Sequence, residues 1–586
     1  MTKLTTASAR RIAAGLTLTA TVSTLAGMAP AHAAGASVAQ PRTIAGISFP
    51  AAMPSLVEGP LPYYRLIHGP DPAPFVSEVL RQDLTQEGSV LVARDKQGLL
   101  RGISDGTRDE TQILPDMSAS SGRAMPVEIL ERFAARVFAR QDIVPKDATV
   151  VRFGKPSPVF AQSAGQNPTG GPTTGSTLPS ILFTYFPAQR FIAGLPVEGL
   201  GSHLTVGIGN DGSIRAFARR WNAAMPAGTI APTASAAQIE KEIVAQLERF
   251  RPRYGSVSVD SITPAYYDGN ATFIQPVYEF VATLGGGDRG VLRDHVRGYV
   301  PVGRLVEPLP VLGMDAAGPS PTAPTSAQAN ARRALGNPNQ ITLGQYVNRE
   351  CTSGPPNCLD MANAYVSGFD NPLAALLGFP AIDRTQYYWA YSFEVLGAAN
   401  AYLNAVNVAY TNPHGDWWLN TTIGNYVPTG DPWTVNQIGT GGNPGYGAAA
   451  GGRLATWIID SCEIIPSYYD LQYSTGNGWT AFNNWWPVFQ GLHRALGFRT
   501  QMLLGENAMN TDIAFLMSLG APAESAFYNE VAAQGAFPTY LDAHLNLTVQ
   551  YDRVSTMSDG RNLSESIYSV QGQSAATELV NHWMGN

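Results

Sequence analysis

The chain has 586 residues, of which 44% are hydrophobic and 14% charged, and its formal net charge is −7. This length suggests roughly three to four domains, and the hydrophobic content is ample for large cores. A mildly acidic chain without basic clusters is a poor candidate for binding nucleic acid or an anionic membrane surface.

Residues 1–33 have the layout of a secretory signal peptide. Three cations among the first eleven residues precede a small, apolar stretch, and an A-x-A cleavage pattern follows at Ala31–Ala33. We therefore expect export and a mature chain that begins at Ala34, whose net charge falls to −10 once those three cations are removed. The pair Arg10-Arg11 leaves the choice between general and twin-arginine export open. No later apolar run is long enough to span a bilayer.

Residues 34–312 predict a mixed α+β region, with two possible modules at about 34–160 and 180–312. Residues 125–141 carry Ile129, Phe133 and Val137 at helical spacing, which predicts an amphipathic helix. Residues 164–179 are rich in Gly, Pro and Thr and predict a long surface loop between the modules.

The second module predicts a hairpin followed by a helix. Two alternating strands, 203–208 and 213–218, flank Asn210-Asp211-Gly212, which is a strong hairpin signal. Ser235 can cap a helix whose apolar face carries residues 239, 243 and 247, and later strands are expected at 275–281 and 296–300. This pattern resembles the PepSY and related propeptide modules of secreted bacterial proteases. An ordinary α+β binding domain fits the same pattern.

Residues 313–339 predict a linker. They are rich in Pro, Ser, Thr and Ala, lack apolar periodicity and contain the dibasic pair Arg332-Arg333. We expect an exposed segment that is open to cleavage between the N-terminal region and a domain at 340–586.

The chain contains three cysteines, Cys351, Cys358 and Cys462. The first two flank a short Pro-rich loop, which predicts a disulfide in an oxidising compartment. Cys462 is then left over. An odd cysteine in an exported protein is an intermolecular bridge, a free reactive thiol or a buried inert residue, and only its neighbours can decide between these.

Two motifs in the C-terminal domain follow predicted strands. A β-prone run that begins near residue 405 ends in His414-Gly415, and an apolar run at 454–459 ends in Asp460-Ser461-Cys462-Glu463. In open α/β sheets ligands bind at the carboxyl ends of strands. An imidazole there lowers the pKa of a neighbouring thiol and later protonates the leaving amine. The bare backbone N–H of Gly415 and that of Cys462 would stabilise an oxyanion.

These paired motifs resemble the caspase, legumain and gingipain superfamily of cysteine peptidases. Asp460-Ser461-Cys462-Glu463 is similar to the Glu-Ala-Cys-Glu of legumains, and the segment 388–394 resembles an uncharacterised family of secreted bacterial proteins with a caspase-like domain. The resemblance implies an open, mostly parallel sheet with helices on both faces, and a His414–Cys462 dyad. Departures are the polar residues before His414 and Ile464-Ile-Pro, where peptidases place a Gly-rich turn.

Other candidates are weaker. We expect His493 to pack on an apolar helix, and His68-Gly69 has no cysteine nearby. No ligand spacing predicts zinc, and no cofactor is expected. Trp417-Trp418 and Trp485-Trp486 could line a carbohydrate-binding face, although such pairs are more often core.

Two function classes therefore remain. One is a secreted cysteine peptidase or related acyl-transfer enzyme, acting on a peptide or protein and restrained by an inhibitory N-terminal region. The other is a non-catalytic binding protein that kept a degenerate caspase-like fold.

Overall fold

The structure is a computed structural model that describes residues 41–585, except for the segments given in the next sentence. These are 52, 54–55, 108, 120–122, 148, 167–178, 252–255, 286–292, 311, 313–340, 348–383, 388–394, 413, 417–419, 424–430, 441, 505–507, 534–538 and 543–546. The predicted signal peptide lies outside the described residues. So do the predicted linker and the predicted disulfide Cys351–Cys358.

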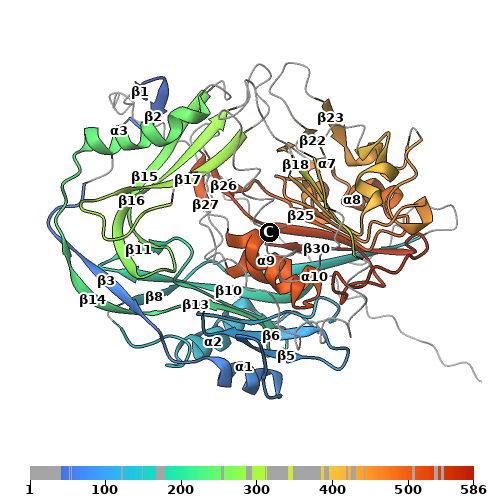
Figure 1. Cartoon of the computed structure of the whole chain (residues 1–586), viewed down its shortest axis with the longest axis horizontal. Coiled ribbons are helices and arrows are strands. Elements are labelled where there is room, and N and C mark those ends of the chain that lie inside the picture. Colours follow the sequence, from blue (N-terminus) through green and yellow to red (C-terminus); the bar gives the residue numbers. More distant parts are fainter. Residues whose placement is uncertain are drawn as a thin grey trace, which may run out of the picture. The chain divides into compact units, whose positions relative to one another are not determined.

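Most strands of the N-terminal region pair antiparallel, and helices accompany them (Figure 1). Its elements are β1 (Arg42–Ile44), β2 (Ile47–Phe49), β3 (Leu61–Ile67), α1 (Ala73–Leu80), β4 (Thr85–Glu87), β5 (Val90–Arg94), β6 (Leu100–Asp105), β7 (Glu110–Ile113), α2 (Val127–Phe138), β8 (Val150–Phe153), β9 (Ser157–Gly165), β10 (Ser180–Ile192), β11 (Leu195–Glu198), β12 (His203–Gly209), β13 (Ile214–Arg220), β14 (Ala223–Ile230), α3 (Ala236–Leu247), β15 (Ser256–Asp268), β16 (Phe273–Gly285) and β17 (Arg293–Pro301).

The predicted hairpin and the helix that follows it are confirmed. β12 and β13 pair antiparallel, and Gly212 turns the chain between them with φ +78°. The side chain of Ser235 accepts a hydrogen bond from the backbone N–H of Gln238 and so caps α3, whose predicted apolar face is fully buried. β16 and β17 cover the two later strands that the sequence predicts.

The helix predicted near 125–141 is α2, and its buried face agrees with the predicted one only in part. Of the predicted stripe, Val137 is buried and Phe133 packs against the core, but Ile129 is exposed. The other buried residues are Leu130, Ala134 and Phe138, a stripe that begins one residue later. Periodicity over twelve residues therefore predicted the helix but not the exact rotation of its buried face.

The C-terminal part contains both strands and short helices. Its elements are β18 (Leu343–Val347), β19 (Arg384–Tyr387), β20 (Val408–Asn412), β21 (His414–Asp416), β22 (Asn420–Ile423), β23 (Asp431–Thr434), β24 (Thr456–Ile459), α7 (Tyr468–Thr475), α8 (Thr480–Trp485), β25 (Arg494–Phe498), β26 (Leu503–Leu504), α9 (Ala508–Ser518), α10 (Ala523–Ala533), β27 (Thr539–Asp542), β28 (Leu547–Gln550), β29 (Val554–Asp559) and β30 (Glu578–Met584). The structure is thus an α/β protein with a large mixed sheet.

Five neighbouring strands of this sheet run parallel, in the spatial order β19, β18, β20, β24, β25. In chain order this is 2-1-3-4-5, a common order of doubly wound sheets, and the direction of winding switches between β18 and β20. All four residues of β24 are buried, as expected for a strand covered on both faces. Ile458 belongs to the same core as Ile513 of α9, while Trp457 packs in another core with Trp485 of α8. The pair Trp485-Trp486 is therefore core rather than a binding face.

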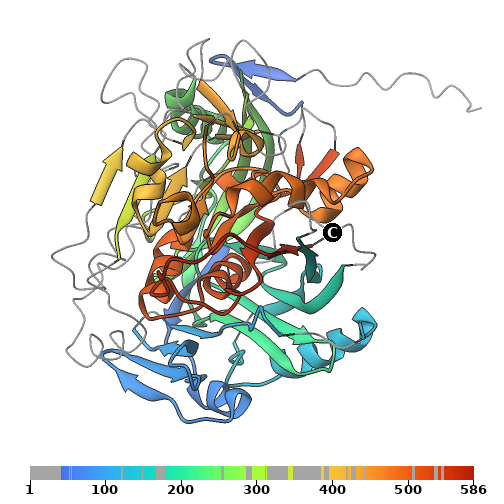
Figure 2. The ribbon, with the colours of Figure 1, turned by 90° about the vertical axis from the view of Figure 1, so that its right-hand side faces the viewer.

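The sheet continues from the C-terminal part into the N-terminal region. β25 pairs antiparallel with β29, β29 with β30, and β30 with β9 along its whole length (Figures 1 and 2). On another edge, β17 pairs parallel with β26. One hydrophobic core also contains residues from both sides of the predicted linker. The domain boundary itself stays a prediction, but the regions on its two sides are joined by backbone hydrogen bonds.

A buried charge cluster also joins these regions. Arg220 of β13 contacts Asp512 of α9 at 2.5 Å, Glu530 of α10 at 2.9 Å and Glu110 of β7 at 3.4 Å, and all four side chains are at most 4% exposed. Gln112 also donates hydrogen bonds to Glu110 and Glu530. Burial disfavours the charge on Arg220, but the three carboxylates raise its pKa well above the ordinary value.

We predict that Arg220→Met destabilises the protein by about 3–5 kcal/mol, because it leaves buried carboxylates without their cation. Arg215→Met is the matched control, since Arg215 lies on the same strand in a partly exposed pair with Asp211 and should change stability by less than about 1 kcal/mol. Urea unfolding of both variants measures the difference. Equal effects would show that the cluster contributes little.

We predict that Glu530→Gln becomes more stable relative to the natural protein as the pH rises above the ordinary glutamate value. Burial raises the pKa of Glu530 well above that value, with further increases from Glu110 and Asp512. The folded state therefore binds this proton more tightly than the unfolded state, and the associated stability is lost as pH rises from the unfolded pKa to the folded one. Unfolding curves at pH 4 to 9 measure the trend. A constant difference between the two proteins would contradict it.

Among the described residues, no helix combines the length and apolar character that a membrane span requires.

Candidate functional site

The two predicted motifs follow neighbouring parallel strands. Tyr410 of β20 is opposite Ile458 of β24, and Thr411 is opposite Ile459. The ladder extends one residue further, because the backbone N–H of Asp460 donates to the carbonyl of Thr411 at 2.9 Å. The carboxyl ends of both strands therefore reach the same edge of the sheet, as the sequence predicts.

Gly415 lies directly against the Ser461-Cys462 backbone. A Cβ atom at Gly415 would overlap the carbonyl oxygen of Cys462 and the hydroxyl of Ser461. Close packing against this backbone therefore leaves no room for a side chain at position 415. The sequence suggests a second reason for glycine here, which is the role of its backbone N–H in oxyanion binding. His414 and Gly415 form β21, which pairs antiparallel with β22. The backbone of His414 is thus placed at this edge, while its side chain lies outside the described part of the structure.

Cys462 occupies a sharp turn after β24. The backbone N–H of Ser461 donates to the carbonyl of Ile459 at 3.0 Å, and that of Glu463 donates to the carbonyl of Thr500 at 3.1 Å. Glu463 has φ +51°, in the left-handed region that glycine usually occupies. The sequence lacks the Gly-rich turn expected after the cysteine, and Glu463 adopts the corresponding conformation. Strained turns of this kind are concentrated at functional sites.

Cys462 is buried, with only 8% of the residue exposed. The backbone N–H of Met502, which follows β25, lies 3.3 Å from its Sγ and donates to it. Cys462 also belongs to the main hydrophobic core, so the residues packed around it cover the thiol.

A polar network lies immediately before the cysteine. The carboxylate of Asp460 accepts hydrogen bonds from the hydroxyl of Tyr410 at 2.5 Å and from the side-chain amide of Asn510 at 3.0 Å. The amide of Asn510 also donates to the hydroxyl of Tyr410 at 3.0 Å. All three side chains are buried. The network ties β20, β24 and α9 together at the carboxyl end of the sheet.

A second carboxylate, Asp552, lies beside the segment that covers the thiol. Its Oδ1 accepts a hydrogen bond from the backbone N–H of Leu503 at 3.1 Å. Burial raises the pKa of Asp552 to about 6, although that hydrogen bond and the charges of Arg297 and Arg553 oppose the rise, and Asp460 adds to it. Burial also lowers the pKa of Arg553 to about 10.

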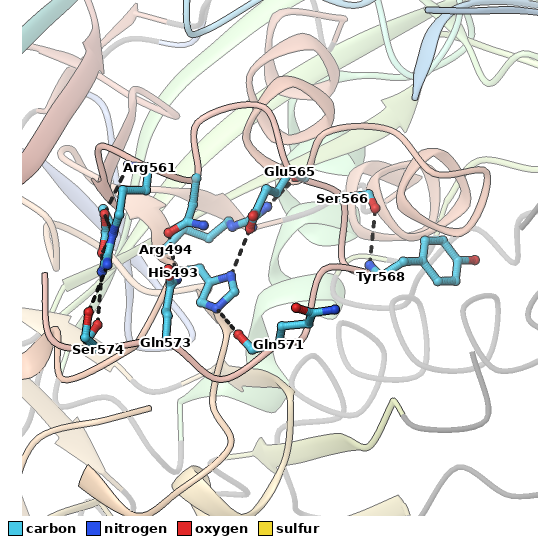
Figure 3. A network of polar contacts seen from close by, with 11 residues as sticks. His493, Arg494, Arg561, Glu565, Ser566, Tyr568, Gln571, Gln573 and Ser574 are labelled. Carbon is cyan, nitrogen blue, oxygen red and sulfur yellow. Dashed lines mark hydrogen bonds and ion pairs between the residues drawn. The ribbon is translucent and has the colours of Figure 1, made fainter. Parts of the chain in front are cut away.

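His493 lies on neither a helix nor this site, which corrects the prediction that it packs on an apolar helix. It precedes β25, because the preceding helical segment ends before residue 490. Its Nδ1 is 2.9 Å from Glu565, and its Nε2 is 3.2 Å from the carbonyl of Gln571 (Figure 3). Although burial raises the pKa of Glu565, the hydrogen bond with His493 and the charge of Arg494 hold it below the ordinary value. This network binds the loop before β30 to the amino end of β25, at the opposite end of the strands from Cys462.

His68 is exposed and contacts Asp109 in the N-terminal region at 2.9 Å. Its pKa is raised, first by the hydrogen bond to Asp109 and then by the charge of that carboxylate. Among the described residues no group of three or more His, Cys, Asp or Glu side chains could hold a metal ion.

Sequence reasoning did not identify Met502, Asn510 and Asp552. The sequence does point to Asp460, because this acid lies within the predicted motif, two residues before Cys462. The other three come from segments 40 to 90 residues downstream of Cys462, and neither spacing nor composition sets them apart. Tertiary packing of β26, α9 and the segment before β29 brings them to this edge.

We predict that Gly415→Ala displaces the Cys462 turn and destabilises the protein by roughly 1–3 kcal/mol, the usual range for overpacking. Gly106→Ala is the control, because a Cβ there meets no atom within 4 Å. The measurements are the free energy of unfolding and the rate at which iodoacetamide alkylates Cys462. An unchanged rate in Gly415→Ala would show that this contact does not position the thiol.

Comparison with known proteins gives no family. No family model matches the chain, and no curated protein matches it. Among solved structures, the chain is similar to an uncharacterized protein from Eubacterium rectale ATCC 33656, with 9% sequence identity and a TM-score of 0.26. The match covers 46% of this chain and 92% of that one. A similarity this weak carries no argument about fold or function.

Proposed function

We propose that the protein is a secreted cysteine peptidase, or a related acyl-transfer hydrolase, in which Cys462 is the nucleophile and His414 the base. One observation carries the proposal. Pairing of β20 with β24 brings the backbone of the His414-Gly415 motif against the backbone of Cys462. The two motifs therefore meet, as a dyad requires.

The reaction follows from these groups. His414 takes the thiol proton, and the sulfur attacks the carbonyl carbon of a peptide bond to give a tetrahedral oxyanion. The backbone N–H groups of Gly415 and Cys462 would donate to that oxygen. His414 then returns the proton to the leaving amine as the thioester forms. Water, deprotonated by His414, attacks the thioester, which releases the acid and restores the thiol.

The caspase-like character of the C-terminal part belongs to this proposal. It is supported by the parallel run that contains both motif strands as neighbours and by helices on both faces of β24. Export through residues 1–33 and the disulfide Cys351–Cys358 are parts of the same proposal, which rests for them on the sequence alone.

The proposal also includes an inhibitory role for the N-terminal region, which would keep the peptidase inactive. Two observations support it: the thiol is covered, and the N-terminal region shares strand pairing with the segments around it. A peptidase that is exported in this form would stay inactive until the cover is removed. The proposal also explains why a nucleophile lies within a core.

We predict that alkylation of Cys462 by iodoacetamide stays fast near neutral pH, with a midpoint below the value of about 8.5 for an ordinary thiol. His414→Ala should slow it and move the midpoint upward, because the base is lost. His68→Ala is the matched control, since it removes the other His-Gly histidine and should change nothing. Mass spectrometry of Cys462 across a pH series measures the rates.

Peptide hydrolysis by the protein, once the cover over Cys462 has been removed, provides the second measurement. Cys462→Ala and His414→Ala should each abolish it, and the double variant should lose little more, because the two residues act as a unit. The burial of Cys462 is the observation that favours the other candidate, a binding protein with a degenerate peptidase fold. A midpoint near 8.5 that ignores His414→Ala would decide for that candidate.

A further inference from the structure

Helix α9 carries two buried polar side chains whose partners lie on opposite sides of it. The amide of Asn510 donates hydrogen bonds to the hydroxyl of Tyr410 and to the carboxylate of Asp460, each at 3.0 Å. The carboxylate of Asp512 contacts the guanidinium of Arg220 at 2.5 Å. Residues two apart on a helix are separated by about 200° around its axis. The helix is therefore held on one side by strand ends of the C-terminal part and on the other by the N-terminal region.

The two partners of Asn510 lie at the ends of the strands that lead into the proposed dyad. Tyr410 of β20 precedes His414 by four residues, and Asp460 follows β24 and precedes Cys462 by two. The hydroxyl of Tyr410 also donates to Asp460 at 2.5 Å, so the three side chains are bonded in a closed triangle. Each is at most 4% exposed, which protects these hydrogen bonds from competition by water. Fixing Asp460 in this way fixes the start of the turn that carries the thiol.

The contact of Asp512 makes the position of α9 depend on the N-terminal region. Arg220 of β13 is the shared cation of Asp512, Glu530 and Glu110. Glu530 belongs to α10, which packs against α9. Without the guanidinium, acids from α9, α10 and β7 would remain buried and close together without a cation, and α9 would have to move to separate or hydrate them. Such a movement would withdraw Asn510 from the strand ends.

We propose that Asn510 is a positioning residue for the nucleophile Cys462, and that Arg220 positions Asn510 by holding α9. This rests on the proposed function and adds a second role for the N-terminal region, which covers the thiol and also keeps the site aligned. The two roles belong to different elements, because β7 and β13 hold α9 whereas β17 pairs with β26 beside the thiol. The body of the N-terminal region therefore stays bound in the active enzyme, after the cover over the thiol has been removed.

The test measures the pH midpoint for alkylation of Cys462 by iodoacetamide in the full mature chain. Asn510→Ala removes the amide, and Tyr410→Phe removes only the hydroxyl that the amide contacts. Asp512→Asn weakens the contact between α9 and Arg220 but leaves the other two acids of that cation in place. Mass spectrometry gives the rates, circular dichroism establishes that each variant is folded, and urea unfolding gives its stability.

Two buried residues that make their hydrogen bonds away from α9 provide matched controls. Asn581 of β30 donates its amide to the carbonyl of Thr556 at 2.8 Å, and Arg494 of β25 pairs with Glu565 at 3.0 Å. Both residues are at most 1% exposed. Asn581→Ala and Arg494→Met should therefore destabilise the protein, as the test variants do, without altering the contacts of α9.

We expect Asn510→Ala, Tyr410→Phe and Asp512→Asn to raise the midpoint by about half a pH unit or more toward that of an ordinary thiol, because the thiol no longer keeps its place beside the base. Both controls should keep the natural midpoint. In a His414→Ala background, Asn510→Ala should cause no further shift, since a positioning residue acts through the dyad. If Asn510→Ala fails to fold, Tyr410→Phe and Asp512→Asn decide the question.

The proposal is overturned if the test variants keep the natural midpoint, or if the controls shift it equally, which would make the effect one of general stability. A further shift in the His414→Ala background would overturn it as well. If Asp512→Asn alone has no effect, the part assigned to Arg220 is rejected. A natural midpoint of about 8.5 that ignores His414→Ala rejects the peptidase itself. A midpoint that responds to His414→Ala but not to Asn510→Ala rejects only the positioning role.

Discussion

Backbone pairing between β20 and β24 is the constraint on which the rest of the site depends. Two parallel strands that are hydrogen-bonded to one another must end at the same edge of their sheet, so the residues that follow them have to share that edge. The close approach of Gly415 to Cys462 follows from this, as does the turn at Glu463, which must fold back at once to leave room.

Strand pairing also explains why the two regions of the chain cannot be treated as separate bodies. β30 forms backbone ladders with β29 on one side and with β9 on the other, so the C-terminal part completes a sheet that the N-terminal region begins. The charge cluster around Arg220 reinforces this join from a different face, with acids from α9 and α10 against a cation of β13. A region held by sheet pairing is bound more firmly than one that only touches a surface, so separating the two parts would need more than a cut of the chain between them.

The sequence predicted local structure well and assembly poorly, for physical reasons. The turn at Gly212, the cap at Ser235 and the strand before Cys462 are set by residues close to one another in the chain, which is why periodicity and turn chemistry sufficed. The rotation of α2 and the position of His493 depend on what packs against them, and both predictions were wrong in detail. Met502 and Asp552 reach the site through hydrogen bonds with Cys462 and Leu503, between residues far apart in the sequence, and no local pattern predicts such contacts.

The ladder between β9 and β30 has a consequence for how the protein folds. Its two strands are separated by about four hundred residues, and contacts between such distant segments form slowly because a very large loop must close first. Until residues 578–584 have been synthesised, β9 can pair with β10 but its other edge stays open. An unpaired strand edge invites association with other chains. The growing chain is therefore exposed to association with other chains until its last strand is in place.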